Sequence, residues 1–520
     1  MSLLRRLKKF LKNYKRNNNP HFLLPEDKKK IDELSKEGME YLEKLREIDE
    51  KLLAIQNSTR TTIPQFSAIH NYLRMQVKWY YNWHLNPYAS KIHWGALSLY
   101  TFVLFGALVY GMFGAPYKPT LAESGITCTS VQSGSWSDEA TWNDADCGAG
   151  RVPGSGDDVV ISSTHTVTLA GPINIGDGDI SISGTLTTNN YAVTAGDLTI
   201  NANGTMNVGS STVTLSGNFD SSASGAKFGT GYPGGDTSTI VFTNTGGATV
   251  KEAAFNTGQG FYNFTINANV TVTALSALQV RNILTVNSGA SLTDGANSYP
   301  LWLYSTSTTI APISNSGDIT GMDEYIYRGS GTNVLVAATT YSKLTLVPIG
   351  NANFSFKLDT GTTTCTTLNV DHATAGYTAT LNTNNQTLTC SSNLNIGGYA
   401  GADGKGAITA GASAINVAGN FTINTDGTFT ANTSTVTLNS SSANQTVTTG
   451  GQSFYNLTIN NTQATYDDII ISGNLDVNGT LTITDGELKL STNNPNVYTA
   501  GNVTIGAAGS VTKGTGTWTF

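Results

Sequence analysis

Charged residues are scarce in this chain of 520 residues. Asp, Glu, Lys and Arg make up only 12% of it, whereas they make up about 25% of a typical soluble domain. Cysteine is also rare, with four residues, and so is histidine, with six. Glycine is plentiful at 55 residues.

The few charges are unevenly distributed. Residues 1–93 carry 18 Lys or Arg and 10 Asp or Glu, a net charge of +8, and residues 94–520 carry 11 and 26, a net charge of −15. This asymmetry indicates two parts in different environments and argues against one large cytoplasmic enzyme. An acidic part with so few charges is a poor nucleic-acid binder, so we expect no nucleic-acid partner.

Residues 94–117 contain no charged side chain and read WGALSLYTFVLFGALVYGMFGAPY. A run of this length exceeds the ~20 residues that cross a bilayer, and its terminal aromatic residues suit the membrane interfaces. The alternative is a buried core helix. The run begins far from the N-terminus and lacks a small-residue cleavage site, which predicts a retained signal anchor and a lipid bilayer as partner.

Flanking charges and cysteines predict the orientation. Arg74, Lys78 and Lys91 precede the run, and only Lys118 follows it closely, which favours a cytoplasmic N-terminus. All four cysteines follow the run, as expected of an extracytoplasmic part with disulfides. The local pairings are Cys128 with Cys147 and Cys365 with Cys390, although four unrelated buried thiols are the alternative.

The cytoplasmic residues 1–93 are predicted to be helical. Residues 3–16 form a basic amphipathic helix suited to an anionic membrane surface, or else a solvated basic tail. Residues 26–57 carry a heptad pattern, which predicts self-association as a coiled coil or packing as a hairpin on an aromatic helix at 64–85.

After a linker at 118–132, the sequence becomes an array of short Thr- and Val-rich strands, such as those expected at 198–200, 213–215 and 481–483, separated by Asn, Gly, Ser and Asp. Residues 196–215 read GDLTINANGTMNVGSSTVTL and residues 419–438 read GNFTINTDGTFTANTSTVTL, so the chain repeats itself. Degenerate repeats of about 20–30 residues predict a solenoid of stacked coils. The predicted fold is therefore mainly β, a parallel β-helix or β-solenoid of roughly 15 coils over the residues from Gly125 onward, with the repetitive part at 196–520.

Stacking explains the composition. One coil cannot bury its apolar side chains alone, whereas stacked coils align Val, Ile, Leu and Phe into inward ladders. Few charges then meet at the ~4.8 Å spacing between strands. A string of β-sandwich domains is the alternative. Because the strand pattern is still in progress at Phe520, we expect the solenoid to continue beyond it.

Residues 133–169 read SGSWSDEATWNDADCGAGRVPGSGDDVVISSTHTVTL. The segment resembles the start of a G8-type domain in Trp136, Trp142, Pro153, Gly154, Gly156 and Asp157, which makes 133–195 the G8-like N-terminal part of the solenoid. The later repeats resemble those of large bacterial β-helix surface proteins. In animals, G8-type domains precede β-helices in secreted and membrane-anchored surface proteins, including a cell-surface hyaluronidase. The resemblance implies a glycan-related role but transfers no catalytic residue.

Candidate residues for chemistry are few. The pairs Asp157–Asp158 and Asp467–Asp468 each precede an apolar strand and suit acid–base hydrolysis, or else backbone capping at a corner. Asp177 and Asp179 suit calcium but lack the remaining ligands of a known calcium loop, so we expect no cofactor. No HExxH or nucleophile-elbow motif occurs in the solenoid, and its basic residues are scattered along the sequence.

The sequence therefore predicts a single-pass cell-surface protein whose solenoid serves as a stalk or adhesin and contacts glycans or another cell. Two alternatives remain: a surface polysaccharide hydrolase or lyase, and a purely structural envelope protein assembled through 26–57.

Overall fold

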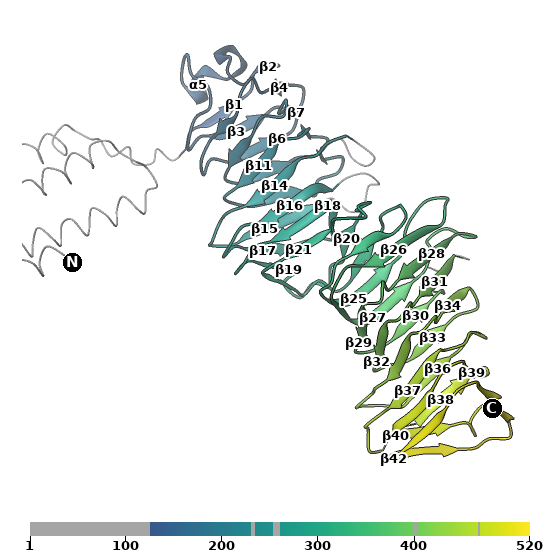
Figure 1. Ribbon diagram of the computed structural model, residues 1–520. Coiled ribbons are helices and arrows are strands. Elements are labelled where there is room, and N and C mark those ends of the chain that lie inside the picture. The colour runs from purple at the N-terminus through teal and green to yellow at the C-terminus, as the bar shows by residue number, and fades with distance from the viewer. Residues whose placement is uncertain (1–124, 230–234, 253–259, 399–403, 466–467) are drawn as a thin grey trace, which may run out of the picture. The chain divides into compact units, whose positions relative to one another are not determined.

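The computed structural model describes residues 125–520 except 230–234, 253–259, 399–403 and 466–467 (Figure 1). The chain divides into two compact units, Met1–Lys118 and Pro119–Phe520. The helices predicted within 1–93 and the span predicted at 94–117 lie outside the described residues. Within the described ranges, no helix has both the length and the apolar character needed to cross a membrane.

The second unit is a parallel β-solenoid of about 15 turns, which confirms the predicted fold class. The strands lie side by side in successive coils, with colour following the sequence along the stack (Figure 1). The paired strands are parallel throughout, and the one antiparallel contact recorded in the described part is the isolated bridge between Ser130 and Trp142.

The coils share five sheets. Sheet 1 has nine strands: β1 (Thr127–Thr129), β3 (Asp158–Ile161), β6 (Ile180–Ile182), β9 (Leu198–Ile200), β12 (Phe219–Ser221), β15 (Ala248–Glu252), β17 (Thr271–Ala274), β19 (Ser291–Thr293) and β22 (Asp318–Thr320). Sheet 2 has five strands: β2 (Gly134–Ser135), β4 (Thr166–Thr168), β7 (Thr185–Thr187), β10 (Thr205–Asn207) and β13 (Lys227–Phe228).

Sheet 3 extends through most of the solenoid. Its strands are β5 (Ile173–Asn174), β8 (Val193–Ala195), β11 (Thr212–Leu215), β14 (Thr239–Phe242), β16 (Phe261–Ile266), β18 (Leu278–Val286), β20 (Leu301–Leu303), β21 (Ile313–Asn315), β23 (Tyr325–Tyr327), β25 (Thr340–Leu346), β27 (Thr362–Val370), β29 (Thr387–Cys390), β30 (Leu394–Ile396), β32 (Ala414–Val417), β33 (Phe421–Ile423), β35 (Thr435–Leu438), β36 (Gln445–Thr448), β37 (Asn456–Asn460), β38 (Asp468–Ser472), β40 (Leu481–Lys489) and β42 (Val503–Thr512).

Two smaller sheets complete the later coils. Sheet 4 comprises β24 (Val334–Val336), β26 (Phe354–Leu358), β28 (Thr378–Asn382), β31 (Lys405–Thr409) and β34 (Gly427–Thr430). Sheet 5 comprises β39 (Leu475–Val477), β41 (Val497–Thr499) and β43 (Trp518–Thr519).

The core consists of inward columns of apolar side chains, one residue from each coil. In strand β9, Leu198 and Ile200 are buried and Thr199 between them is partly exposed, as the period of two requires. The register of the strands joins such residues across coils. One column of fully buried side chains in sheet 1 consists of Cys128, Val159, Ile180, Leu198, Phe219 and Val250.

An aromatic cluster fills the core where sheet 2 ends. Phe261 contacts Phe219, Phe228 and Phe264 edge-on, with ring centroids 5.1, 5.6 and 5.0 Å apart. These rings bury large apolar surfaces in favourable edge-to-face geometry. The cluster therefore keeps the stack closed at a point where one of its sheets is interrupted.

The first coil differs from the sequence-based expectation. Residues 127–129, expected to belong to a linker, form β1 and pair in register with β3. Two short helices follow, η1 (Glu139–Thr141) and α5 (Asp144–Cys147). The side chain of Asn143 caps α5 by accepting a hydrogen bond from the Ala145 N–H at 3.0 Å.

Candidate functional site

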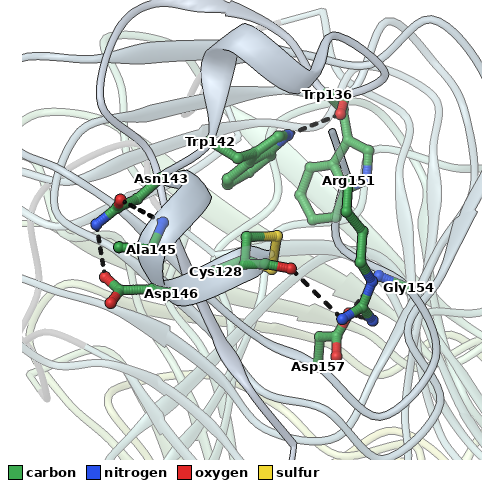
Figure 2. The surroundings of a disulfide bond; sticks show 10 residues. Cys128, Trp136, Trp142, Asn143, Ala145, Asp146, Arg151, Gly154 and Asp157 are labelled. Carbon is green, nitrogen blue, oxygen red and sulfur yellow. Dashed lines mark hydrogen bonds and ion pairs between the residues drawn. A yellow bond between two sulfur atoms is a disulfide. The ribbon is translucent and has the colours of Figure 1, made fainter. Parts of the chain in front are cut away.

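A disulfide between Cys128 and Cys147 joins β1 to α5 at the start of the solenoid (Figure 2). Both cysteines are fully buried. Because it ties the excursion containing α5 back to the first strand, the disulfide restricts how far this end of the stack can open.

The two motif tryptophans pack beside this disulfide. Trp136 and Trp142 meet edge-on with centroids 5.1 Å apart, and the Trp142 Nε1–H donates to the Trp136 carbonyl oxygen at 2.9 Å (Figure 2). Both rings are buried. They therefore close the first coil and are not available as a ligand platform.

The other motif residues form a turn around one carboxylate. Asp157 is buried, accepts a hydrogen bond from the Gly154 N–H at 2.7 Å, and forms an ion pair with Arg151 (Figure 2). Pro153 is buried, and Gly156 adopts a φ of +86°, a conformation that favours glycine. The carboxylate of Asp157 is thus engaged in forming the turn that leads into β3.

The predicted acidic residues at the next corners bind backbone groups of neighbouring coils. Asp158 accepts from the Asp179 N–H at 3.0 Å, and Asp179 accepts from the Asp197 N–H at 2.7 Å. Burial, followed by the charges of Asp197 and Asp158, raises the pKa of Asp179. Asp177 accepts from the Ser216 hydroxyl at 3.0 Å. Among the described residues, no group of three or more His, Cys, Asp or Glu side chains is arranged to hold a metal ion.

The second predicted pair lies far along the chain. Asp468 begins β38 and accepts from the Lys489 ammonium at 2.8 Å, and its backbone N–H donates to Asn444 Oδ1 at 3.0 Å. Asp467 lies outside the described residues. Asp468 thus lies in a coil well separated from those that carry Asp157 and Asp158, and it is not brought together with them.

The predicted disulfide between Cys365 and Cys390 is not formed, and that prediction is wrong for this structure. The two cysteines lie opposite each other on β27 and β29 as buried free thiols, with their Sγ atoms 3.4 Å apart. Adjacent strands hold in-register Cβ atoms near the strand spacing of about 4.8 Å, whereas a disulfide requires about 3.8 Å. The hydrogen bond to Cys365, together with burial, raises the pKa of the Cys390 thiol.

A polar cluster that sequence analysis missed lies where sheet 2 ends. The Arg281 guanidinium forms a buried ion pair with Asp236, with Nη2 2.7 Å from Oδ1 and 2.6 Å from Oδ2. Their side chains are only 4% and 1% exposed. Such a pair is expensive to desolvate, and removal of one partner leaves an uncompensated buried charge.

Glu252 and two further side chains complete this cluster. Burial raises the pKa of Glu252 to about 8, while the Gln279 N–H, 2.9 Å from Oε2, and the Arg281 charge partly oppose the shift. Burial also raises the pKa of Tyr304, which is influenced by Arg328 and Glu252. A neutral carboxyl beside an ion pair is an arrangement capable of proton transfer.

The signal for this cluster was present in the sequence but needed the coil register. Arg281, Tyr304 and Arg328 each follow one of the paired residues Val280, Leu303 and Tyr327. They therefore lie in consecutive coils, although they are far apart in the sequence. Arg328 also lies over the Trp302 ring, 4.2 Å from its centroid.

Comparison with known proteins identifies one domain. The G8 domain family matches residues 141–230. No curated protein and no solved structure matches the chain significantly. The matched region begins and ends later than the predicted 133–195, and it ends next to β13, the last strand of sheet 2.

The fold and the domain together define the class: a G8 domain followed by a parallel β-solenoid. This chain therefore has the predicted G8 and β-helix layout. The layout indicates an extracellular surface protein.

Proposed function

We propose that the protein is a single-pass, membrane-anchored cell-surface stalk or adhesin whose solenoid contacts glycans or another cell. The uncharged run at 94–117 supports the anchor, and the excess of basic residues before it supports a cytoplasmic N-terminus. Residues 26–57 are proposed to assemble several copies.

The observation that carries this proposal is the continuous stack of in-register coils. Each coil contacts its neighbours through parallel strands and buried columns, an arrangement that forms an extended surface rather than a single pocket. The outward positions are mostly Thr, Ser and Asn, for example Thr435 and Thr437 on β35. Such a surface offers many hydroxyl and amide groups with little charge.

The placement is tested with epitope tags at both ends of the full chain, expressed in cells. Protease added to intact cells should remove the C-terminal tag and leave the N-terminal tag protected. Detergent permeabilisation should expose both tags, as a control for protease access. Protection of both tags in intact cells would contradict the proposed orientation.

The adhesin role is tested separately on the same cells. Cells displaying the full chain should attach to a glycan-coated surface or to one another more than cells displaying a chain shortened after residue 124. Equal attachment, with equal surface amounts of both chains, would contradict an adhesive role.

One observation favours a second function, a surface polysaccharide-active enzyme. Glu252 combines a pKa raised by burial with the nearby charge of Arg281, a kind of tuning that is found at acid–base catalytic sites. Depolymerisation of a polysaccharide by the full chain, lost in Glu252→Gln and retained in Glu139→Gln, would support it. A chain that releases no product from a polysaccharide panel would not be such an enzyme.

A further inference from the structure

An open groove lies on the outer side of sheet 2, over β2 and β4. Its volume is about 710 Å³, and it is lined by Ser133, Ser135, Thr166, Thr168, Asn189 and Tyr191, together with small or apolar neighbours. This volume falls within the range of small-molecule sites, about 300–1,000 Å³. The groove lies within and just before the matched G8 region, and neither the family match nor the aspartate pairs assign a role to it.

The floor of the groove presents ordered hydroxyl groups. Thr166 and Thr168 flank the buried Val167 on β4, so both side chains point outward, and Thr168 lies opposite Ser135 of β2. Within the described residues, the hydroxyls of Thr166 and Thr168 make no hydrogen bond to the protein. They are therefore available to a ligand at positions fixed by the sheet.

One rim of the groove carries an exposed aromatic ring on a rigid turn. Tyr191 is 39% exposed, and its N–H donates to the Thr188 carbonyl at 3.0 Å. Asn189 and Asn190 between them adopt positive φ values of 52° and 67°, which fixes a tight turn. The Asn189 amide also donates to the Leu169 carbonyl of the preceding coil at 2.9 Å. The backbone that carries the ring is thus fixed before any ligand arrives, which lowers the entropic cost of binding.

The lining contains no acidic or basic side chain. It therefore offers no guanidinium or ammonium group to a carboxylate or sulfate, and no acid–base pair for bond cleavage. A flat aromatic ring, hydroxyls and an amide can instead match a sugar ring, which has an apolar face and a hydroxylated edge.

We propose that this groove binds an uncharged glycan chain and does not cleave it. The inference rests on the proposed surface function for its setting and adds the class of ligand and the place of contact. A second groove, of about 440 Å³, is lined by Asn218, Thr249, Thr271 and Thr273 among others but has no aromatic residue in its lining. It provides a comparison of hydroxyl groups without a ring.

The experiment measures binding of the purified full-length protein to an array of neutral oligosaccharides (gluco-, xylo-, manno- and galacto-) and to oligogalacturonate as the acidic probe. We expect binding to at least one neutral series and not to oligogalacturonate. Tyr191→Ala should raise the dissociation constant at least about tenfold, and Tyr191→Phe should bind nearly as well as the wild type. The affinity of Thr168→Val should lie between those of the wild type and Tyr191→Ala.

Two variants serve as controls. Tyr498→Ala removes a ring that is 42% exposed on β41, and Thr273→Val alters the second groove. Both should bind like the wild type. A thermal melt of each variant establishes that its solenoid remains folded.

Four results would overturn the inference: no binding to any neutral series, binding to oligogalacturonate alone, equal affinity of Tyr191→Ala and the wild type, or release of shortened chains. The protease experiment on intact cells is independent of all four. Surface display with no glycan binding would reject the groove as a glycan site and leave the proposed location unchanged. Glycan binding by a chain that is protected from protease in intact cells would reject the location and leave the groove as a glycan site.

Discussion

Asparagine performs two tasks at the corners of the coils. Among the described residues, nine of the eleven non-glycine residues with positive φ are asparagines, including Asn203 and Asn432. Other asparagines bind the next coil, as Asn393 Oδ1 accepts from the Asn420 N–H at 2.9 Å and Asn420 Oδ1 from the Thr446 N–H at 2.8 Å. The first task follows from local sequence, because Asn tolerates the left-handed region. The second depends on which residues stack, so single-sequence analysis could not assign it.

At the same scale, Glu252 should make stability depend on pH. Its carboxyl has a pKa of about 8 in the folded protein, because it is buried, whereas the pKa of an unperturbed glutamate is 4.5. Between these two pH values the unfolded chain releases a proton that the folded chain keeps. The contribution of Glu252 to the free energy of unfolding is therefore fully present below pH 4.5 and is lost as the pH rises towards 8. Glu252→Gln should flatten this decline in urea-unfolding free energies measured from pH 4.5 to 8.

The matched variant for this measurement is Glu139→Gln, which alters an exposed carboxylate at the start of η1. It should keep the slope of the wild type. If Glu252→Gln also kept that slope, the buried carboxyl would not be the source of the pH dependence.

At the scale of elements, the presence of strands could be predicted from the sequence, whereas their full extent and their pairing partners could not. Alternation of Thr with Val, Leu or Ile predicted strands at 198–200, 213–215 and 481–483, and all three are strands. The same pattern could not indicate that β40 continues to Lys489, since its second half pairs with β38 and its first half with β37. The spacing did suggest that Cys365 and Cys390 are neighbours, but it could not show that they lie opposite each other on parallel strands as free thiols.

In-register stacking also makes the outer surface sensitive to added charge. Thr437 on β35 lies opposite Thr458 on β37, and both are partly exposed. Two glutamates placed there would lie about 4.8 Å apart. Like charges directly opposite are destabilising, whereas an opposite-charge pair contributes about 0.2–1 kcal/mol. We therefore expect T437E/T458E to be less stable than its two single variants predict, and T437K/T458E to be more stable.

Urea unfolding of each single and double variant gives the coupling energy. Both couplings should shrink in high salt, because the charges are exposed to solvent. If the coupling energies of T437E/T458E and T437K/T458E had the same sign, repulsion between stacked like charges would not explain why this surface carries so few charged residues.

At the scale of the whole molecule, the sequence predicted the kind of fold better than it predicted the site. Apolar periodicity and the internal repeat depend on the packing of adjacent coils, which is encoded locally in segments such as 196–215 and 419–438. The cluster of Asp236, Glu252 and Arg281 depends instead on side chains from separate coils. The groove beside Tyr191 likewise requires three consecutive coils to be in register. A site on a solenoid is therefore hidden until the coil boundaries are known to within a residue.

The state of the four cysteines provides a test of where the whole solenoid is made. The structure contains one disulfide, Cys128–Cys147, and two thiols, Cys365 and Cys390. Disulfides persist in oxidising compartments and are rare in the cytosol. Full-length protein isolated from cells and alkylated in denaturant without reductant should therefore be labelled at Cys365 and Cys390 alone. After reduction, peptide mapping should find label on all four cysteines.

The double variant C365A/C390A serves as the control, with no label before reduction and two labels afterwards. Labelling of all four cysteines in the unreduced wild type would place the solenoid in a reducing compartment and contradict its proposed location outside the cell. Labelling of none would mean that Cys365 and Cys390 had joined despite the strand spacing. Labels on Cys365 and Cys390 alone agree with both the parallel register and an oxidising compartment. A reducing compartment would raise the number of labelled cysteines to four, and a second disulfide would lower it to zero.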